Sequence, residues 1–138
     1  MTIKEYTKLP KEAIDLRTEI FIKEQGFIDE FDDKEDISTH LVMFSNNIPV
    51  ASCRYYFDNE KNAYYIGRIV VVKDLRNKGL GKQILKEAEI RIAKQTIKTI
   101  YLSAQQDKAD FYIKQGYEIT GEPYFEEHCP HILTRKEL

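Results

Sequence analysis

A strand and a helix are predicted on either side of ten residues, Lys73-Asp74-Leu75-Arg76-Asn77-Lys78-Gly79-Leu80-Gly81-Lys82. The run before this turn, Ile66–Val72, is apolar almost throughout and predicts a strand buried on both faces. After the turn, apolar residues recur at helical spacing as far as Ile92 and predict an amphipathic helix. Glycines let a ligand approach the backbone, and a helix N-terminus presents unpaired N–H groups. The turn therefore predicts an anion site, commonly filled by phosphate, with Arg76, Lys78 and Lys82 around it.

Two common nucleotide motifs do not fit this turn. A Walker loop needs four residues between its two glycines, whereas only Leu80 lies between Gly79 and Gly81. It also needs Ser or Thr after its lysine, whereas Gln83 follows Lys82. A dinucleotide fingerprint needs a third glycine where Ile84 stands, and an acidic residue about 20 positions on, where 98–102 hold none. The remaining pattern, R-x-x-G-x-G between a strand and a helix, also fits an ordinary basic turn facing water.

The rest of the chain alternates between the two types of element. This order is typical of an α/β sandwich built on one mixed sheet, and we expect residues 1–138 to form a single domain. The acidic run Asp29–Asp36 reads as a loop. Strands are predicted at Thr2–Tyr6, His40–Ser45, Val50–Phe57, Ala63–Val72, Thr99–Ser103, Tyr117–Thr120 and His131–Thr134, and helices at Pro10–Ile22 and Asp107–Gln115.

Composition excludes several classes of protein. Twenty-one Lys and Arg against 23 Asp and Glu give a net charge of −2, without the basic excess of a nucleic-acid binder. No apolar run approaches a membrane span or a secretion signal, so we expect a cytoplasmic protein with no membrane partner. Cys53 and Cys129 are far apart in the sequence, which favours two reduced thiols. The cluster His128, Cys129 and His131 lacks the paired spacing of zinc sites, so no metal is expected.

Two ordered motifs carry a resemblance to a known family. Val70–Gly81 resembles the acetyl-CoA signature of the GCN5-related N-acetyltransferase (GNAT) superfamily, and Phe111–Tyr117 resembles its F-Y-x-x-x-G-[FY] motif. The resemblance implies a mostly antiparallel central sheet flanked by helices, in which the strand at Ile69–Val72 splays from that at Thr99–Ser103. Further segments resemble the small bacterial ElaA-like branch, namely Phe21–Gln25, His40, Ala104-Gln105 and Glu126–His131.

The resemblance also implies acetyl-CoA as co-substrate. Its pantetheine arm would lie in the strand gap and its pyrophosphate over the amides of Arg76–Lys82. Lys73 replaces a frequent proline, while Gln105 and Lys108 replace an asparagine and a small residue, which leaves side-chain contacts of the second motif open. The implied donor-binding residues are Ile69, Val70, Val71, Val72, Arg76, Asn77, Lys78, Gly79, Leu80, Gly81, Lys82, Gln105, Phe111, Tyr112 and Lys114.

The implied reaction is direct attack of a primary amine on the acetyl thioester. An alkyl ammonium with a pKa near 10 must first lose a proton, which requires a base. A backbone N–H near Val70 is the implied donor to the oxyanion, and Tyr112 the implied acid for the departing thiolate. The candidate bases are His131, placed first, and His40, Glu24, Glu126 and Glu127, of which Glu24, His40 and Glu126 are also expected to contact the acceptor.

The acceptor is the least defined part of the sequence-based prediction. The acidic run 29–36 favours a cationic small molecule over a phosphorylated sugar, although a solvated loop fits the same run. Homodimers are common in the superfamily. A CoA-binding sensor without catalysis is the alternative, since no residue of the sequence is an unambiguous base.

Overall fold

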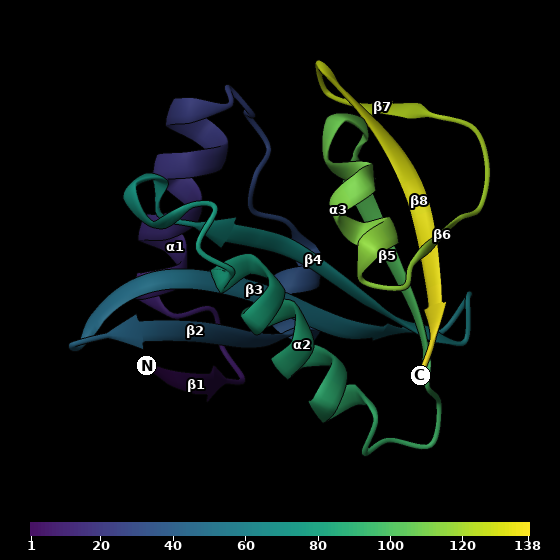
Figure 1. Ribbon diagram of the computed structural model, residues 1–138, viewed down its shortest axis with the longest axis horizontal. Helices are drawn as coiled ribbons and strands as arrows, with labels where there is room; N and C mark the ends of the chain where they lie inside the picture. The colour runs from purple at the N-terminus through teal and green to yellow at the C-terminus, as the bar shows by residue number, and fades with distance from the viewer.

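The computed structural model describes all 138 residues and contains one eight-stranded sheet with strand order β1-β2-β3-β4-β5-β8-β6, in which β7 also pairs with β8 (Figure 1). Every neighbouring pair is antiparallel except β4 with β5. The predicted mixed, mostly antiparallel sheet is therefore confirmed. The strands are β1 Thr2–Tyr6, β2 Thr39–Ser45, β3 Ile48–Asp58, β4 Ala63–Val71, β5 Thr99–Gln105, β6 Glu118–Ile119, β7 Tyr124–Glu126 and β8 Cys129–Glu137.

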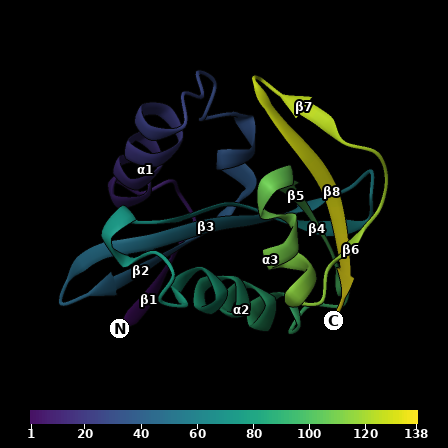
Figure 2. The ribbon, with the colours of Figure 1, turned by 45° about the horizontal axis from the view of Figure 1, so that its top comes forward.

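Helices cover both faces of the sheet (Figure 2). On one face, α1 (Lys11–Arg17) and the π-helix η1 (Thr18–Glu24) pack against Val42, Phe44 and Val70. On the other face lie α2 (Leu80–Ile92) and α3 (Ala109–Lys114). Three short 3₁₀ helices complete the chain: η2 Asp33–Ile37, η3 Lys73–Leu75 and η4 Gln106–Lys108.

The apolar stripe that predicts α2 forms the centre of the main core. This core joins α2 to the β2–β5 strands through residues such as Leu41, Ile66 and Ile100. Because α2 contributes its whole apolar stripe, the glycine turn before it is anchored firmly to the sheet. The stripe residues are all 4% exposed or less: Leu80, Ile84, Leu85, Ala88 and Ile92.

Several elements differ from the sequence-based prediction. The helix predicted to end at Ile22 continues to Glu24, but as a π-helix from Thr18 onward. Part of the acidic run is not a loop, because Asp32 and Glu35 form a capping box that begins η2. Strand β7 was not predicted, since three residues are too few to show a period. No helix of the structure has the length and apolarity needed to cross a membrane.

The parallel pair β4–β5 separates soon after it forms, which confirms the predicted splay. Its register contains only Tyr64 opposite Ile100 and Tyr65 opposite Tyr101. Farther along, β4 carries a bulge, because its pairing with β3 shifts by one residue between Gly67 and Val70. Arg68 within this bulge has a φ of +53°. A bulge bends and twists its strand, and here it follows shortly after Tyr65, the last residue of β4 that pairs with β5.

Candidate active site

A cavity of about 690 Å³ opens where β4 and β5 separate. One wall is β4 from Tyr65 to Ile69, and the opposite wall is β5 from Leu102 to Gln105 with Tyr112 of α3. The segment between η1 and η2 and the β7–β8 hairpin line the remaining sides. The cavity therefore lies between the two halves of the sheet and opens along much of β4.

The glycine turn beside this cavity has six free amides. None of the N–H groups from Asn77 to Lys82 donates a hydrogen bond to a protein group. Gly79 caps α2 with a φ of +83°, and Asn77 also has a positive φ of +64°. Left-handed residues are typical of turns whose backbone amides bind anions, and this turn leads into the positive end of the helix dipole. The arrangement suits a phosphate-type anion.

Arg76 does not turn its side chain toward those amides. Its guanidinium binds both carboxylate oxygens of Glu24 at 2.6 and 2.9 Å, and its Nε donates to the carbonyl of Val71 at 3.2 Å. The bond from Arg76 lowers the pKa of Glu24 below its usual value. Glu24, a sequence-predicted acceptor contact and candidate base, therefore lies at the turn and outside the cavity, because Arg76 holds its carboxylate there.

The edge of β4 toward the gap keeps unpaired backbone groups. The N–H of Val72 donates to Val50 on β3, so strand alternation directs the N–H of Val71 toward the gap, while the C=O of Val71 accepts from Arg76 Nε. Val70 is 3% exposed and packs against η1, whereas Ile69 lines the cavity. The side chains of this strand therefore contribute packing, and its main chain is available to a ligand in the gap.

Tyr112 lies on α3 and lines the cavity. Its ring makes edge contacts with Phe111 and Tyr117, with centroids 5.0 and 6.2 Å apart. Burial raises the pKa of Tyr112 well above its usual value. The phenol therefore keeps its proton, as a proton donor must. A Cβ on Gly81 would lie 3.8 Å from the Phe111 ring, so α3 adjoins the glycine turn, while Lys114 is exposed on the last turn of α3.

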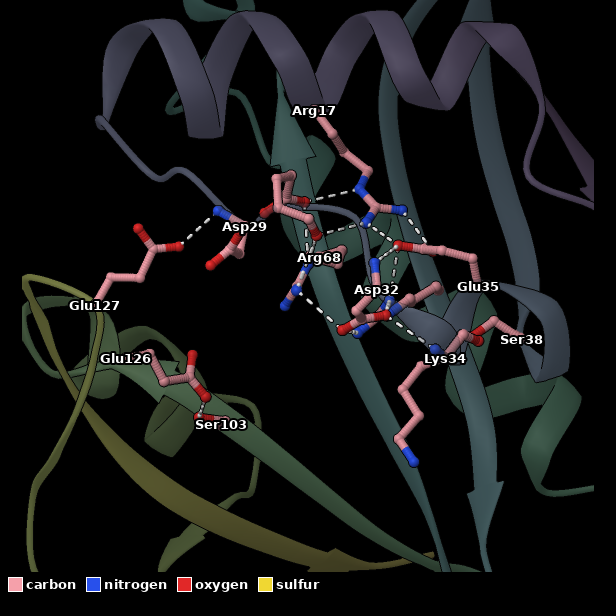
Figure 3. Close-up of polar contacts among 12 residues, drawn as sticks. Arg17, Asp29, Asp32, Lys34, Glu35, Ser38, Arg68, Ser103, Glu126 and Glu127 are labelled. Carbon is pink, nitrogen blue, oxygen red and sulfur yellow. Dashed lines mark hydrogen bonds and ion pairs between the residues drawn. The ribbon is translucent and has the colours of Figure 1, made fainter.

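His131 lies on β8 and lines the same cavity, with only 6% of its side chain exposed. Its Nδ1 is 3.0 Å from the carbonyl of Cys129, and its Nε2 is 3.0 Å from Glu126 Oε2. Tyr124 stacks on the imidazole at 6.3 Å and 27°. Glu126 also accepts a hydrogen bond from Ser103 Oγ at 3.2 Å, as Figure 3 shows. The structure thus brings His131 and Glu126 together.

The other two candidate bases have different surroundings. Glu127 accepts the amides of Ile28 and Asp29 at 2.8 and 2.9 Å, and these two bonds lower the pKa of Glu127 (Figure 3). His40 is 1% exposed beneath η2, with Nε2 against the Glu35 carbonyl, and burial lowers the pKa of its ring. His40 therefore lies beneath η2, behind the residues that line the cavity, and does not line the cavity itself.

Three of the six carboxylates in the acidic run Asp29–Asp36 are paired with arginines from other elements (Figure 3). Arg17 binds Glu30 at 2.8 Å and Glu35 at 2.6 Å. Asp32 receives both guanidinium nitrogens of Arg54 at 2.7 and 3.1 Å. We name Arg17, Arg54, Arg68, Glu30, Asp32 and Glu35 the arginine–carboxylate cluster. The run is therefore only partly a solvated loop, and Asp29 and Asp33 are its residues that line the cavity without a cation partner.

Burial acts differently on two carboxyls of this cluster. It raises the pKa of Glu30, and the nearby arginines reduce this effect without reversing it. Burial also acts to raise the pKa of Glu35, but hydrogen bonds and charge from Arg17 and Arg54 outweigh it and lower that pKa. The cluster fixes the segment from Glu30 to Glu35 against the bulge, since Arg68 binds Glu30 and Asp32.

Comparison with known proteins identifies the family. A family model described as an acetyltransferase (GNAT) domain matches residues 8–138. The chain belongs to the GNAT acetyltransferase family. The N-acetyltransferase YjcF of Bacillus subtilis is 33% identical over 131 residues, which cover 92% of this chain and 91% of YjcF. Protein ElaA of Escherichia coli is 29% identical over 130 residues, which cover 91% of this chain and 85% of ElaA.

Solved structures agree with this assignment. The crystal structure of Escherichia coli ElaA has a TM-score of 0.84 and 26% identity, covering 99% of this chain and all of ElaA. The resemblance to the GNAT superfamily and to its ElaA-like branch is confirmed. An aminoglycoside 6′-N-acetyltransferase complexed with coenzyme A has a TM-score of 0.74 and 17% identity, covering 99% of this chain and 97% of that one. At this identity the likeness shows the fold.

Sequence reasoning missed several residues that line the cavity of this GNAT protein. Tyr124 and Ser103 complete the hydrogen bonds around Glu126, and Arg68 supports the bulge. Tyr124 stands two positions before Glu126, so strand alternation would have placed both on one face had β7 been recognised. Nothing local marks Arg68, because a positive φ on a non-glycine residue is invisible in sequence.

Proposed function

We propose that this protein transfers an acetyl group from acetyl-CoA to a primary amine of a small molecule. The observation that carries the proposal is the row of free amides from Asn77 to Lys82 beside the gap between β4 and β5. A phosphate group and an extended arm are the two parts of an acyl-CoA that such a turn and such a gap accommodate. The aminoglycoside acetyltransferase with the same fold, complexed with coenzyme A, supports this assignment.

On the donor side, backbone groups do most of the binding. The amides of the turn hold the pyrophosphate, and Lys78 and Lys82, both exposed, add charge beside it. Arg76 anchors the turn through Glu24 and Val71. The main chain of Ile69–Val72 pairs with the pantetheine arm, while Gln105, Phe111 and Lys114 border it.

In the reaction, the amine nitrogen forms a bond to the acetyl carbon as the bond from that carbon to sulfur breaks. A backbone N–H of β4 near Val70 stabilises the developing oxyanion. Tyr112 gives its proton to the departing sulfur and recovers one from the new amide nitrogen. The pair of His131 and Glu126, 3.0 Å apart, supplies the base that first takes the ammonium proton.

The charge of the cavity favours a cationic acceptor. Eight carboxylates and five Lys or Arg residues line it, an excess of three negative charges. Arg54 and Arg68 are held by the arginine–carboxylate cluster, and Lys34 and Lys61 lie over the rings of Tyr56 and Tyr101. An excess of negative charge in a cleft attracts cations. The preference predicted from the acidic run thus rests on the carboxylates that remain unpaired, of which Asp29 and Asp33 belong to that run.

Calorimetric titration with acetyl-CoA tests the proposal. A Cβ at Gly81 makes only ordinary contacts, 3.8 Å from Phe111 and Val71, so Gly81→Ala serves as the control for folding. Gly81→Glu places a carboxylate at the anion site, and we expect it to weaken binding by at least about tenfold. Tyr112→Phe is expected to keep the affinity and lose turnover in an amine screen with thiol detection. A parent protein that binds no acetyl-CoA would overturn the proposal, and binding without turnover of any amine would favour a sensor.

A further inference from the structure

His131 is poorly placed to touch an acceptor directly. Both of its ring nitrogens face protein oxygens at 3.0 Å, Nδ1 the carbonyl of Cys129 and Nε2 the carboxylate of Glu126. Its side chain is 6% exposed, whereas that of Glu126 is 44% exposed, and both residues line the cavity. A molecule in the cavity therefore meets the carboxylate of Glu126 first, with the imidazole behind it.

The partners of His131 determine where protons lie. A carbonyl oxygen only accepts, so Nδ1 carries a hydrogen directed at Cys129. With Nδ1 protonated, Nε2 of the neutral ring is an acceptor that faces the carboxylate of Glu126. Nε2 of His131 and the carboxylate of Glu126 can share one proton. After that proton leaves the pair, the pair can accept a new one. Nε2 is thus placed to receive a proton through Glu126.

A hydrogen-bond chain from β5 and β7 orients the other carboxylate oxygen. Ser103 Oγ donates to Glu126 Oε1 at 3.2 Å. Because Ser103 uses its only hydrogen there, the hydroxyl of Tyr124 donates to Ser103 Oγ. Tyr124 also stacks on the His131 ring. The carboxylate of Glu126 is therefore held at both oxygens while it remains open to the cavity.

We propose that Glu126 is the catalytic residue that takes the proton from the acceptor ammonium, and that His131 is a positioning residue that receives this proton from it. This inference rests on the proposed acetyl transfer. One N–H bond of the ammonium breaks as a proton bonds to a carboxylate oxygen of Glu126. A proton then passes from Oε2 to Nε2 of neutral His131, which leaves a neutral amine, a carboxylate and an imidazolium. The imidazolium returns its proton to water through Glu126 after each turnover.

Other groups around the pair set its response to pH. The charged or titratable neighbours are Asp107 and Lys108 on η4, Tyr124 on β7, Glu127 and His128 in the turn between β7 and β8, and Cys129 at the start of β8. Since the pair can accept a proton from the ammonium only after its shared proton has left, kcat is expected to rise with pH. Removing either member of the pair should alter that rise.

The two roles predict different kinetics for Glu126→Gln and His131→Asn. Glu126→Gln should lower kcat by at least about 100-fold and abolish the pH-dependent rise, because the carboxylate that takes the proton from the amine is then a neutral amide. His131→Asn should lower kcat less and move the rise, since Glu126 remains. Glu126→Asp should restore part of the lost rate. Glu122→Gln, an exposed carboxylate before β7, is the matched control and should behave as the parent.

The donor affinity of each variant separates this inference from the proposed function. Glu126→Gln should bind acetyl-CoA as the parent does, and Tyr124→Phe should lower kcat with little change in donor affinity. A parent that acetylates amines but is slowed more by His131→Asn than by Glu126→Gln would overturn the inference alone. So would an unchanged pH profile in Glu126→Gln. A parent that binds no acetyl-CoA would instead remove the proposed function beneath it.

Discussion

Replacing Arg17 by methionine should destabilise the protein strongly. Arg17 is 1% exposed and donates to Glu30 and Glu35 at distances between 2.6 and 3.3 Å, including one bond to the Glu30 carbonyl. Methionine keeps much of the volume and none of the donors, so two buried carboxylates lose one of their arginines. Breaking a buried ion pair from one side costs about 3–5 kcal/mol. For a chain of 138 residues, a loss of that size lowers the melting temperature by roughly 10–20 °C.

Acidification should narrow the difference in unfolding free energy between the parent and Arg17→Met. The lowered pKa of Glu35 means that its pairing stabilises the parent above the unfolded pKa of about 4.3, and that this stability disappears as pH falls through the folded pKa. The pKa of Glu30 is raised by burial, and without Arg17 it should rise further, so protonation relieves the variant first. Both effects reduce the difference in unfolding free energy at acidic pH.

Urea unfolding followed by far-ultraviolet circular dichroism measures these differences, because the chain contains no tryptophan for fluorescence. Arg91→Met is the matched control, since Arg91 pairs with Glu5 and Glu87 at the surface and such pairs contribute about 0–1 kcal/mol. The reasoning is refuted if Arg17→Met costs no more than Arg91→Met. It is also refuted if the difference stays constant between neutral and acidic pH.

Two further predictions concern the segments that border the cavity. In Glu127→Gln, the amides of Ile28 and Asp29 should lose hydrogen-exchange protection, because a neutral amide accepts more weakly than the carboxylate. In the parent, the pKa of Glu127 is lowered, so the protection of the two amides is complete above the usual pKa of a glutamate and is lost as pH falls through the lowered pKa. Equal protection factors in the parent and in Glu127→Gln would contradict this role of Glu127. Gly79→Ala should cost about 1–2 kcal/mol in urea unfolding, because the site has open space but a φ of +83° that disfavours a Cβ. An unchanged unfolding free energy would show that the turn relaxes, and acetyl-CoA titration of the same variant would show whether its amides keep their alignment.

Local patterns were sufficient to predict the parts of the fold that face a continuous core. The buried residues of α2 are apolar apart from Glu89, which pairs with Lys136 of β8, and the predicted and observed ends of α2 nearly coincide. Strand β4 was found to within one residue, but the expectation that it is buried on both faces was only partly right. Gly67, Arg68 and Ile69 are half-buried because they border the cavity. A strand beside an open ligand site and a fully buried strand have the same apolar pattern.

Contacts across the gap could not be predicted, because they join residues far apart in the chain. Glu127 reaches the amide of Ile28 across the gap, 99 positions away, and on the β4 side of the gap Arg54 likewise reaches Asp32 across 22 positions. Charged residues at such positions read as solvated surface when each is considered alone. The π-helix is similarly hidden, since its residues also continue the helical pattern of α1.

The arginine–carboxylate cluster has a geometric role that an apolar core could not replace. Well-packed apolar side chains can match a buried ion pair in stability, so stability alone does not explain the cluster. Arg17 and Arg68 both donate to the backbone carbonyl of Glu30, at 3.3 and 3.0 Å, and these directional bonds fix the main chain beside the bulge. Glu127 holds the same segment from the opposite half of the sheet. The segment is thus tied to β4 on one side and to the strand pair carrying Glu126 and His131 on the other, so a shift in either half of the sheet moves the walls of the cavity together.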